Sequence, residues 1–185
     1  MRWVVIVVRL AAEPSRHRVA VWRELRRAGA VSLAPGVWAL PATPAFLPVV
    51  ERARALAERG GGELLALDVT GRDEPSGAAL VAAYTDAREA EWAEFVSDCA
   101  KFEAELAKEE RLGKLTLAEL EEEEQSLERL RRWFRDLKVR DVLALPSAIS
   151  AEQRLKDCAE RLEAYANRVY QAAHGFPESQ REERP

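Results

Sequence analysis

The sequence predicts an α+β protein in which a small antiparallel sheet comes first and helices follow. Two observations lead to this prediction. Over roughly the first 70 residues, short apolar runs alternate with helical patterns in the order β-α-β-β-α-β, whereas every periodic segment after about Pro75 has helical spacing. The first part is therefore expected to form a ferredoxin-like βαββαβ domain, residues 1–73. A helical bundle of three helices, residues 74–175, and a disordered tail, residues 176–185, should follow it.

The first strand and the first helix have clear local signals. The run WVVIVV, residues 3–8, is continuous and β-branched, which is typical of a strand covered on both faces. Helices in this fold cover only one face of the sheet, so a twofold partner or the C-terminal half should cover the other. A helix should follow, with Ser15 as its N-cap, and should end near Ala28 because Gly29 comes next.

The remaining elements of the first domain follow from turn chemistry. The runs AVSL and VWALP flank an APG turn and predict a hairpin over residues 30–41. A second helix is expected within residues 42–62. This stretch has prolines near its beginning, which a helix tolerates at its entry, and it ends in three glycines, which no helix would keep. The run ELLALDV, residues 63–69, is expected to be the fourth strand.

Three amphipathic helices are predicted in the second part. The first is expected over residues 76–108. Thr116 and Glu119 form a capping-box pattern for the second, and Ser150 and Gln153 form one for the third. The glutamates at positions 121–124 could suggest a metal site or a basic partner. They are interpreted instead as a structural feature of the early helix turns, because basic residues occupy the later turns and this polarity complements the helix dipole.

Charge is distributed unevenly along the chain. The net charge is −4, yet residues 1–60 contain ten arginines and four glutamates, which is a formal charge of +6. The rest of the chain therefore carries −10. A basic N-terminal part followed by an acidic C-terminal part suggests an anionic partner for the first domain.

Other functional classes find little support in the sequence. Cys99 and Cys158 lack the spacing of a zinc site and are expected to be buried apolar residues. His17 and His174 are single and have no catalytic partner in a motif, so we expect no enzyme, no catalytic residue, no metal site and no cofactor. The N-terminal apolar run is too short for a membrane span, and no targeting signal is recognised in the sequence. A cytoplasmic protein without membrane contact is therefore expected.

The first helix concentrates arginine to an unusual degree. At about 100° per residue, Arg16, Arg23 and Arg27 fall within roughly 40° of one another, opposite the apolar arc. Arg26 flanks them, and Arg18 lies toward the apolar arc. The only acid in the helix is Glu24. Solvated helix faces usually mix charges, and the arginine fork suits phosphate and tetrahedral oxyanions. The pattern predicts either an anion site or a latch onto acidic helices of this chain or of a partner subunit.

These residues also carry a family resemblance. The stretch SRHRVAVWRELRRAGAVSLAPGVWALP, residues 15–41, resembles the N-terminal region of ChrB, a chromate-resistance regulator, and LERLRRWFRDLKVRDVLALP resembles its downstream arginine-rich helix. The likeness spans most of residues 1–175. The first stretch is also similar to the central domain of PaaX-type repressors, which shares a ferredoxin-like fold with a small CRISPR-associated integrase subunit. That subunit would need an aspartate after the first strand to hold metal, and Arg9 stands there instead, so metal-dependent cleavage is not expected.

The resemblance implies a chromate-responsive transcriptional regulator, and we expect it to form a homodimer. Five arginines would then contact promoter DNA, chromate or a similar oxyanion: Arg16, Arg18, Arg23, Arg26 and Arg27. No helix-turn-helix signature accompanies them. The alternative is an interaction and dimerisation module without nucleic acid, whose arginine face docks on acidic helices; the heptad-like leucines of residues 117–137 favour it.

Overall fold

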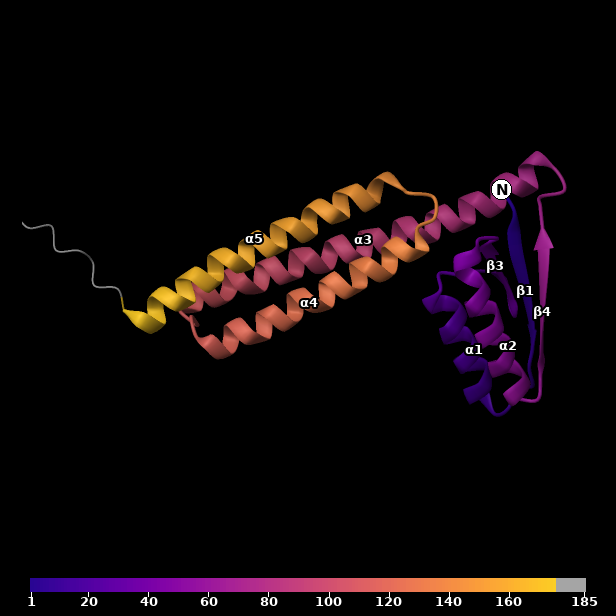
Figure 1. Ribbon diagram of the computed structural model, residues 1–185, viewed down its shortest axis with the longest axis horizontal. Helices are drawn as coiled ribbons and strands as arrows, with labels where there is room; N and C mark the ends of the chain where they lie inside the picture. The colour runs from indigo at the N-terminus through magenta and orange to yellow at the C-terminus, as the bar shows by residue number, and fades with distance from the viewer. Residues whose placement is uncertain (176–185) are drawn as a thin grey trace, which may run out of the picture. The chain divides into compact units, whose positions relative to one another are not determined.

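A computed structural model describes residues 1–175 of the chain (Figure 1). The described residues form two compact units, one of residues 1–90 and 140–143, the other of residues 91–139 and 144–175. The domain limits expected from the sequence remain a prediction. The elements in chain order are β1 (Trp3–Arg9), α1 (Ser15–Arg27), β2 (Val31–Ala34), β3 (Val37–Pro41), the short 3-10 helix η1 (Pro44–Phe46), α2 (Leu47–Arg59), β4 (Glu63–Val69), α3 (Glu74–Leu112), α4 (Leu117–Arg140) and α5 (Pro146–His174).

The four strands form one antiparallel sheet in the order β2-β3-β1-β4. Within β1, Val5 faces Ala39 of β3 on one side and Leu67 of β4 on the other. The continuous apolar run thus occupies a central strand, where its side chains are buried or half-buried on both faces. The prediction of an α+β protein with an antiparallel sheet is confirmed.

Helices α1 and α2 lie side by side on one face of this sheet (Figure 1). Their apolar sides meet the side chains that alternate strand residues direct toward them. Val21 and Leu25 of α1 and Ala53 of α2 are buried with Ile6 and Leu40 of the sheet. Burial of these side chains orients α1 and leaves its opposite side in solvent.

The first turns of α3 cover part of the other face of the sheet. Tyr84 is fully buried and packs edge-to-face on Trp3, with ring centroids 5.7 Å apart, and Val31 and Ala39 complete this small core. The Tyr84 hydroxyl donates a hydrogen bond to the carbonyl oxygen of Arg140, which supplies the partner that a buried phenol requires. The face of the sheet opposite α1 and α2 is therefore covered in part by a helix of the same chain.

Gly29 ends α1 in a crowded place. Its φ of 82° lies in the left-handed region, and the buried Arg88 donates from Nη1 to the Gly29 carbonyl at 2.7 Å. A Cβ at this position would lie 2.8 Å from Arg88 Nη1 and 3.1 Å from Cδ of Arg140. Gly61, which follows α2, has a similar φ of 71°, but a Cβ added there would have no atom within 4 Å.

These two glycines provide a matched test of the packing around α1. We expect Gly61→Ala to cost about 1 kcal/mol of unfolding free energy, since only the left-handed backbone disfavours alanine there. Gly29→Ala should cost about 2 kcal/mol more, because the new methyl group also displaces Arg88 from its hydrogen bond. Urea denaturation of both variants measures the difference, and equal losses would contradict this account.

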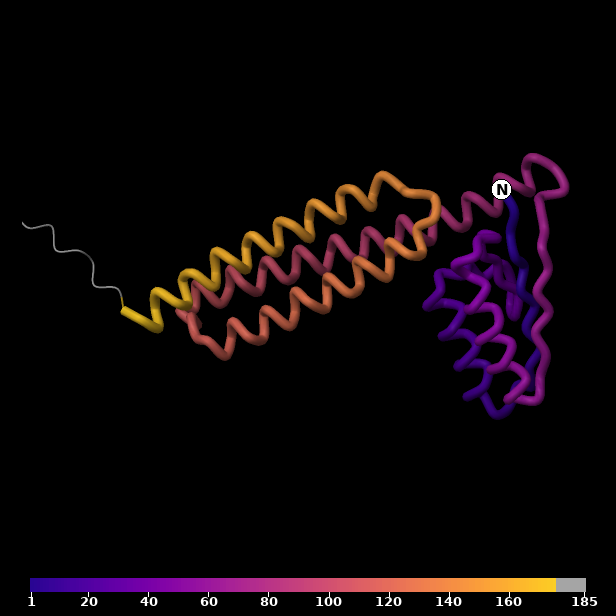
Figure 2. The backbone as a smooth tube through the Cα atoms, viewed as in Figure 1, coloured from indigo at the N-terminus to yellow at the C-terminus, as the bar shows by residue number. Residues whose placement is uncertain are grey.

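Helices α3, α4 and α5 run side by side in the second unit (Figure 2). Leu106, Leu127, Leu137, Cys158 and Val169 are among the buried residues of its core. Both cysteines are buried, as the sequence predicted. No helix within residues 1–175 is long and apolar enough to span a membrane.

Of the three predicted helix caps, one is correct and two are wrong. Thr116 Oγ1 accepts a hydrogen bond from the Glu119 backbone N–H at 3.3 Å, which confirms that cap. Ser15 is the first residue of α1 rather than its cap, because the extended backbone of Pro14 precedes it. Ser150 lies inside α5, which begins four residues earlier at Pro146, since proline is well suited to the first helical position.

Candidate functional site

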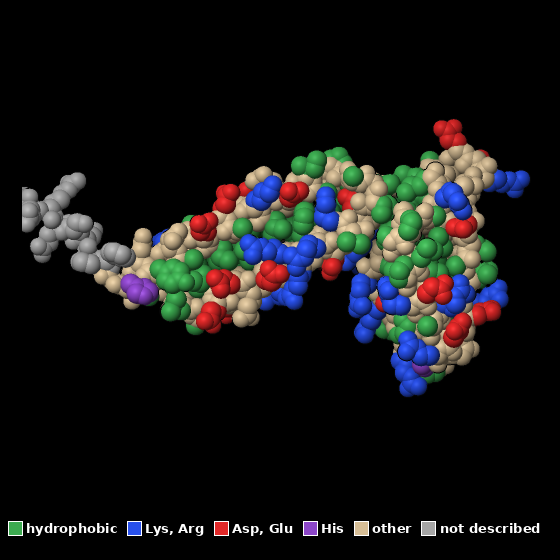
Figure 3. Space-filling model, viewed as in Figure 1, with side chains coloured by type: hydrophobic (Ala, Val, Ile, Leu, Met, Phe, Trp, Pro, Cys, Tyr) green, Lys and Arg blue, Asp and Glu red, His purple; other side chains and the backbone are tan. Residues whose placement is uncertain are grey.

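The arginines of α1 lie on the sides of the helix that the core does not use. Val21 and Leu25 point into the core, and all five predicted site residues, Arg16, Arg18, Arg23, Arg26 and Arg27, are exposed. Lys and Arg side chains gather over the part of the first unit where α1 lies (Figure 3). The helix therefore presents its positive charge to solvent.

Three of the five share one stripe. Arg16, Arg23 and Arg27 are separated by seven and four residues, which places them on one side of a helix. None of the three makes an ion pair with an acidic side chain within the described first unit. We call these three residues the arginine stripe. Its charges are close together and uncompensated, so they generate a local positive potential.

The only acidic residue of α1 is already paired. Glu24 Oε1 lies 2.6 Å from Nε of Arg52 on α2, and the Glu24 side chain is only 13% exposed. The carboxylate is therefore directed toward the neighbouring helix. It supports the packing of α1 on α2 and does not neutralise the stripe.

The helix dipole accounts for some of these arginines and not for others. Arg26 and Arg27 lie in the last turn, where positive charge is favourable. Arg16 and Arg18 lie in the first turn, where positive charge is unfavourable and no acid compensates it. Helix stability thus gives no reason for arginine at the N-terminal end of α1, where the free backbone N–H groups add to the positive potential.

Two of the arginines also have aromatic neighbours. The guanidinium of Arg26 lies 5.4 Å from the ring centroid of Trp22, a cation–π distance. Arg16 donates from Nε to Nε2 of His17 at 3.2 Å. Trp22 is 44% exposed, a high fraction for a tryptophan on the apolar arc. Stacking by Arg26 therefore leaves much of this indole open to solvent.

Arg18 does not join the stripe. It lines a separate cavity of about 320 Å³ that is formed by the end of β1, α1 and the turn between β2 and β3. Trp22 and Trp38 line the same cavity. The structure thus separates the five arginines into a stripe of three, Arg26 beside Trp22, and Arg18 at the cavity.

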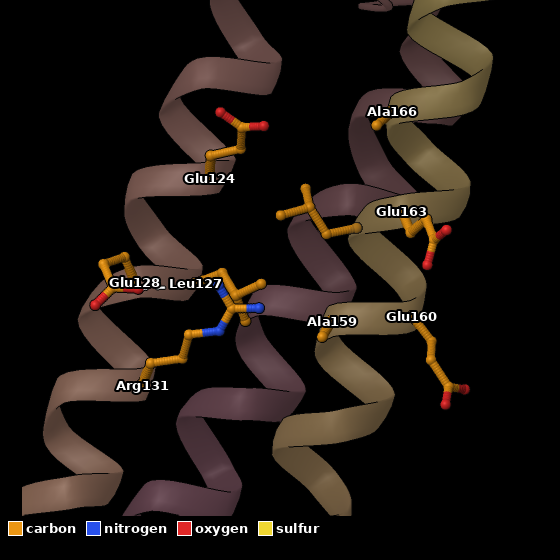
Figure 4. Close-up of a pocket in the computed structure, with 9 residues that line it drawn as sticks. Glu124, Leu127, Glu128, Arg131, Ala159, Glu160, Glu163 and Ala166 are labelled. Carbon is orange, nitrogen blue, oxygen red and sulfur yellow. Dashed lines mark ion pairs between the residues drawn. The ribbon is translucent and has the colours of Figure 1, made fainter.

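The second unit contains an acidic groove that the sequence did not reveal. It lies between α4 and α5, has a volume of about 560 Å³, and has Leu127 and Leu162 at its base. Glutamates of both helices line it, and the Arg131 side chain extends into the space between the helices (Figure 4). The glutamates are Glu124, Glu128, Glu160 and Glu163. Among the residues that the structure describes, Arg131, 3.8 Å from Glu128, is the one basic residue that lines the groove.

One member of the glutamate run at positions 121–124 is buried. Glu123 is only 6% exposed, whereas its neighbours in the run face solvent. Burial, together with the negative charge of Glu109, Glu105 and Glu122, raises the pKa of Glu123 to about 7, and Arg129 opposes this only weakly. The run is therefore not uniform: the helix directs Glu123 toward the carboxylates of α3, while the other three glutamates face solvent.

A second buried carboxylate lies nearby. Desolvation raises the pKa of Glu109, and its Oε2 lies 2.9 Å from the Tyr165 hydroxyl. That hydroxyl is also 2.8 Å from the Lys114 carbonyl oxygen, and its single proton can satisfy only one of these acceptors. Within residues 1–175 no three His, Cys, Asp or Glu side chains come together as a metal site requires.

The chain matches the model of a known protein family. The model is described as "Protein ChrB, N-terminal" and matches residues 18–176. The match includes Arg18, Arg23, Arg26 and Arg27 and begins just after Arg16. No curated protein matches the chain.

Proposed function

The chain belongs to the ChrB N-terminal family, which associates it with chromate resistance, and on that premise we propose that it is a chromate-responsive transcriptional regulator. Its arginine stripe binds DNA phosphates, a tetrahedral oxyanion such as chromate, or both. In this proposal the protein acts in the cytoplasm, as a homodimer and without catalysis.

The observation that carries the proposal is the unpaired state of the stripe. Exposed arginines on helices normally have acidic neighbours one turn away. Here the only acid of α1 is bound to Arg52, and the stripe has no acidic partner in the part of the first unit that the structure describes. The planar arginine forks match two oxygens of a phosphate or chromate group at once.

The arrangement of the elements supports the more specific fold assignment. The order βαββαβ with the strand order β2-β3-β1-β4 is that of a ferredoxin-like domain. We propose this fold for the first unit, and we regard α3 to α5 as its three-helix extension. The sheet then serves as a rigid base that holds the arginine stripe in solvent.

The overall acidity of the chain limits how DNA is bound. A net charge of −4 disfavours nonspecific binding, because that affinity comes mainly from neutralised phosphates. The contact must come from the local basic face of α1. A dimer would present two such faces and would double the number of phosphates contacted.

The proposal is tested by fluorescence anisotropy, which measures binding of the protein to a DNA duplex of its own upstream promoter near physiological salt. We expect tight binding that chromate weakens, because a dianion on the stripe removes the charge that attracts phosphate. Sulfate, which has the same charge and shape, is the matched control for simple ionic competition. Absence of binding both with and without chromate would refute DNA recognition by this chain.

The acidic groove favours one second candidate function. Its four glutamates offer a docking place for the arginine stripe of another copy, and this would make the protein an interaction module without nucleic acid. Assembly of this kind weakens as salt rises and does not respond to DNA. Light scattering across a salt series separates the two candidates, since salt-insensitive association would contradict docking through charge.

A further inference from the structure

The cavity beside Arg18 differs in chemistry from the arginine stripe. Its walls are mainly apolar and come from three elements that are distant in sequence: Val8 and Leu10, Val21 and Trp22, and Pro35 and Trp38. Within the described chain, Arg18 is the one charged residue that lines it, and no acid does. A volume of about 320 Å³ is at the small end of the range for sites that bind small organic molecules.

We infer that this cavity binds a small planar organic anion, an aryl carboxylate. The two indoles, Trp22 and Trp38, provide flat apolar surfaces on which an aromatic ring can stack. Arg18 provides two parallel N–H donors, the arrangement that a carboxylate accepts best.

The exposure of Trp22 supports the same inference. Trp22 lies on the apolar arc of α1 and yet the residue is 44% exposed, so the protein leaves apolar surface in water at the mouth of the cavity. A bound aromatic ring would cover this surface. The guanidinium of Arg26 lies 5.4 Å from the ring centroid of the same indole, and its positive charge further favours an anionic ligand.

The cavity lies within the first unit, and its partly buried walls belong to the core that packs α1 on the sheet. Val8, Leu10 and Trp38 all pack against this core. The backbone N–H of Val8 donates to the Gly36 carbonyl at 2.8 Å and holds the β2–β3 turn against the end of β1. The cavity is therefore bounded by hydrogen-bonded backbone on one side and by a packed helix on the other, which makes it a preformed site.

Two compounds of equal shape test the inference on the full chain. We expect 2-naphthoate to bind and to shift the indole N–H signals of Trp22 and Trp38 in ¹H–¹⁵N spectra. 2-Naphthalenemethanol, which has the same rings without charge, should bind about fivefold more weakly, as is typical for the loss of one partly exposed ion pair.

Variants identify the residues responsible. Arg18→Gln should reduce the affinity for 2-naphthoate by about fivefold and leave the affinity for the alcohol unchanged. Arg59→Gln, the same exchange at the exposed end of α2, is the control and should change neither. Trp22→Ala should weaken the binding of both compounds, since both stack on the indole.

Three results would overturn the inference. The first is that neither indole signal shifts in the presence of 2-naphthoate, and the second is that the acid and the alcohol bind equally. The third is that Arg59→Gln weakens the acid as much as Arg18→Gln does. Because no DNA is present in these measurements, their failure leaves the proposed regulatory function untouched.

Discussion

Reversing the charge of Arg23 and Arg27 together should greatly weaken the binding of promoter DNA. The double variant Arg23→Glu, Arg27→Glu changes the charge of the stripe by four units and places two carboxylates where phosphates would lie. We expect affinity to fall on the order of a hundredfold or more near physiological salt. The slope of log K against log salt should also decrease in magnitude by about two, because the variant neutralises two fewer phosphates.

The stability of the fold should not change much in this variant. Both side chains are exposed and neither takes part in the Glu24–Arg52 pair, so circular dichroism and the thermal midpoint should stay close to those of the parent. The matched control is Arg132→Glu with Lys138→Glu on α4, which makes the same change in net charge in the second unit. Anisotropy titrations with equal losses for both pairs would show that net charge, not the stripe, determines DNA affinity.

Stability of the second unit should decrease as the pH rises from about 4.5 to 7. The folded-state pKa of Glu123 is about 7, above the ordinary value of 4.5, because the carboxylate would be buried among other carboxylates. Between these values the unfolded chain releases the proton while the folded chain retains it, so deprotonation favours unfolding. The raised pKa corresponds to a loss of about 3 kcal/mol that is absent below pH 4.5 and complete above pH 7.

Glu123→Gln should remove this contribution. Glutamine has the shape of the protonated acid and cannot ionise, so the variant should match the parent at pH 4 and exceed it by up to about 3 kcal/mol at pH 8. Urea denaturation at several pH values measures the difference. Glu124→Gln is the control, because the neighbouring carboxylate is exposed and its loss should leave the pH profile unchanged. A Glu123→Gln variant with the parental pH profile would contradict the assignment.

Much of the local structure could be predicted from the sequence because short-range physics decides it. The β-branched run of residues 3–8, the glycine after α1 and the Thr116 cap are each specified by neighbouring residues. The arginine stripe belongs to the same group, since the helical period alone places Arg16, Arg23 and Arg27 together. The family resemblance rested on that same stretch, and the match over residues 18–176 confirms it.

The tertiary structure decided how these elements use one another. The sequence required a cover for the second face of β1 but did not specify that Tyr84 provides it, because that contact joins positions 81 residues apart. Glu24 could not be assigned to Arg52, nor Arg18 to a cavity with Trp38, for the same reason.

Glu123 shows most clearly how packing decides the environment of a side chain. In the sequence it is one of four adjacent glutamates, and only the rotation of α4 against its neighbours selects it for burial. Local patterns determine which segments become helices and strands and which residues share a helix face. The partner of each side chain, and the pKa that follows from that partner, depend on packing between segments that are distant in the sequence.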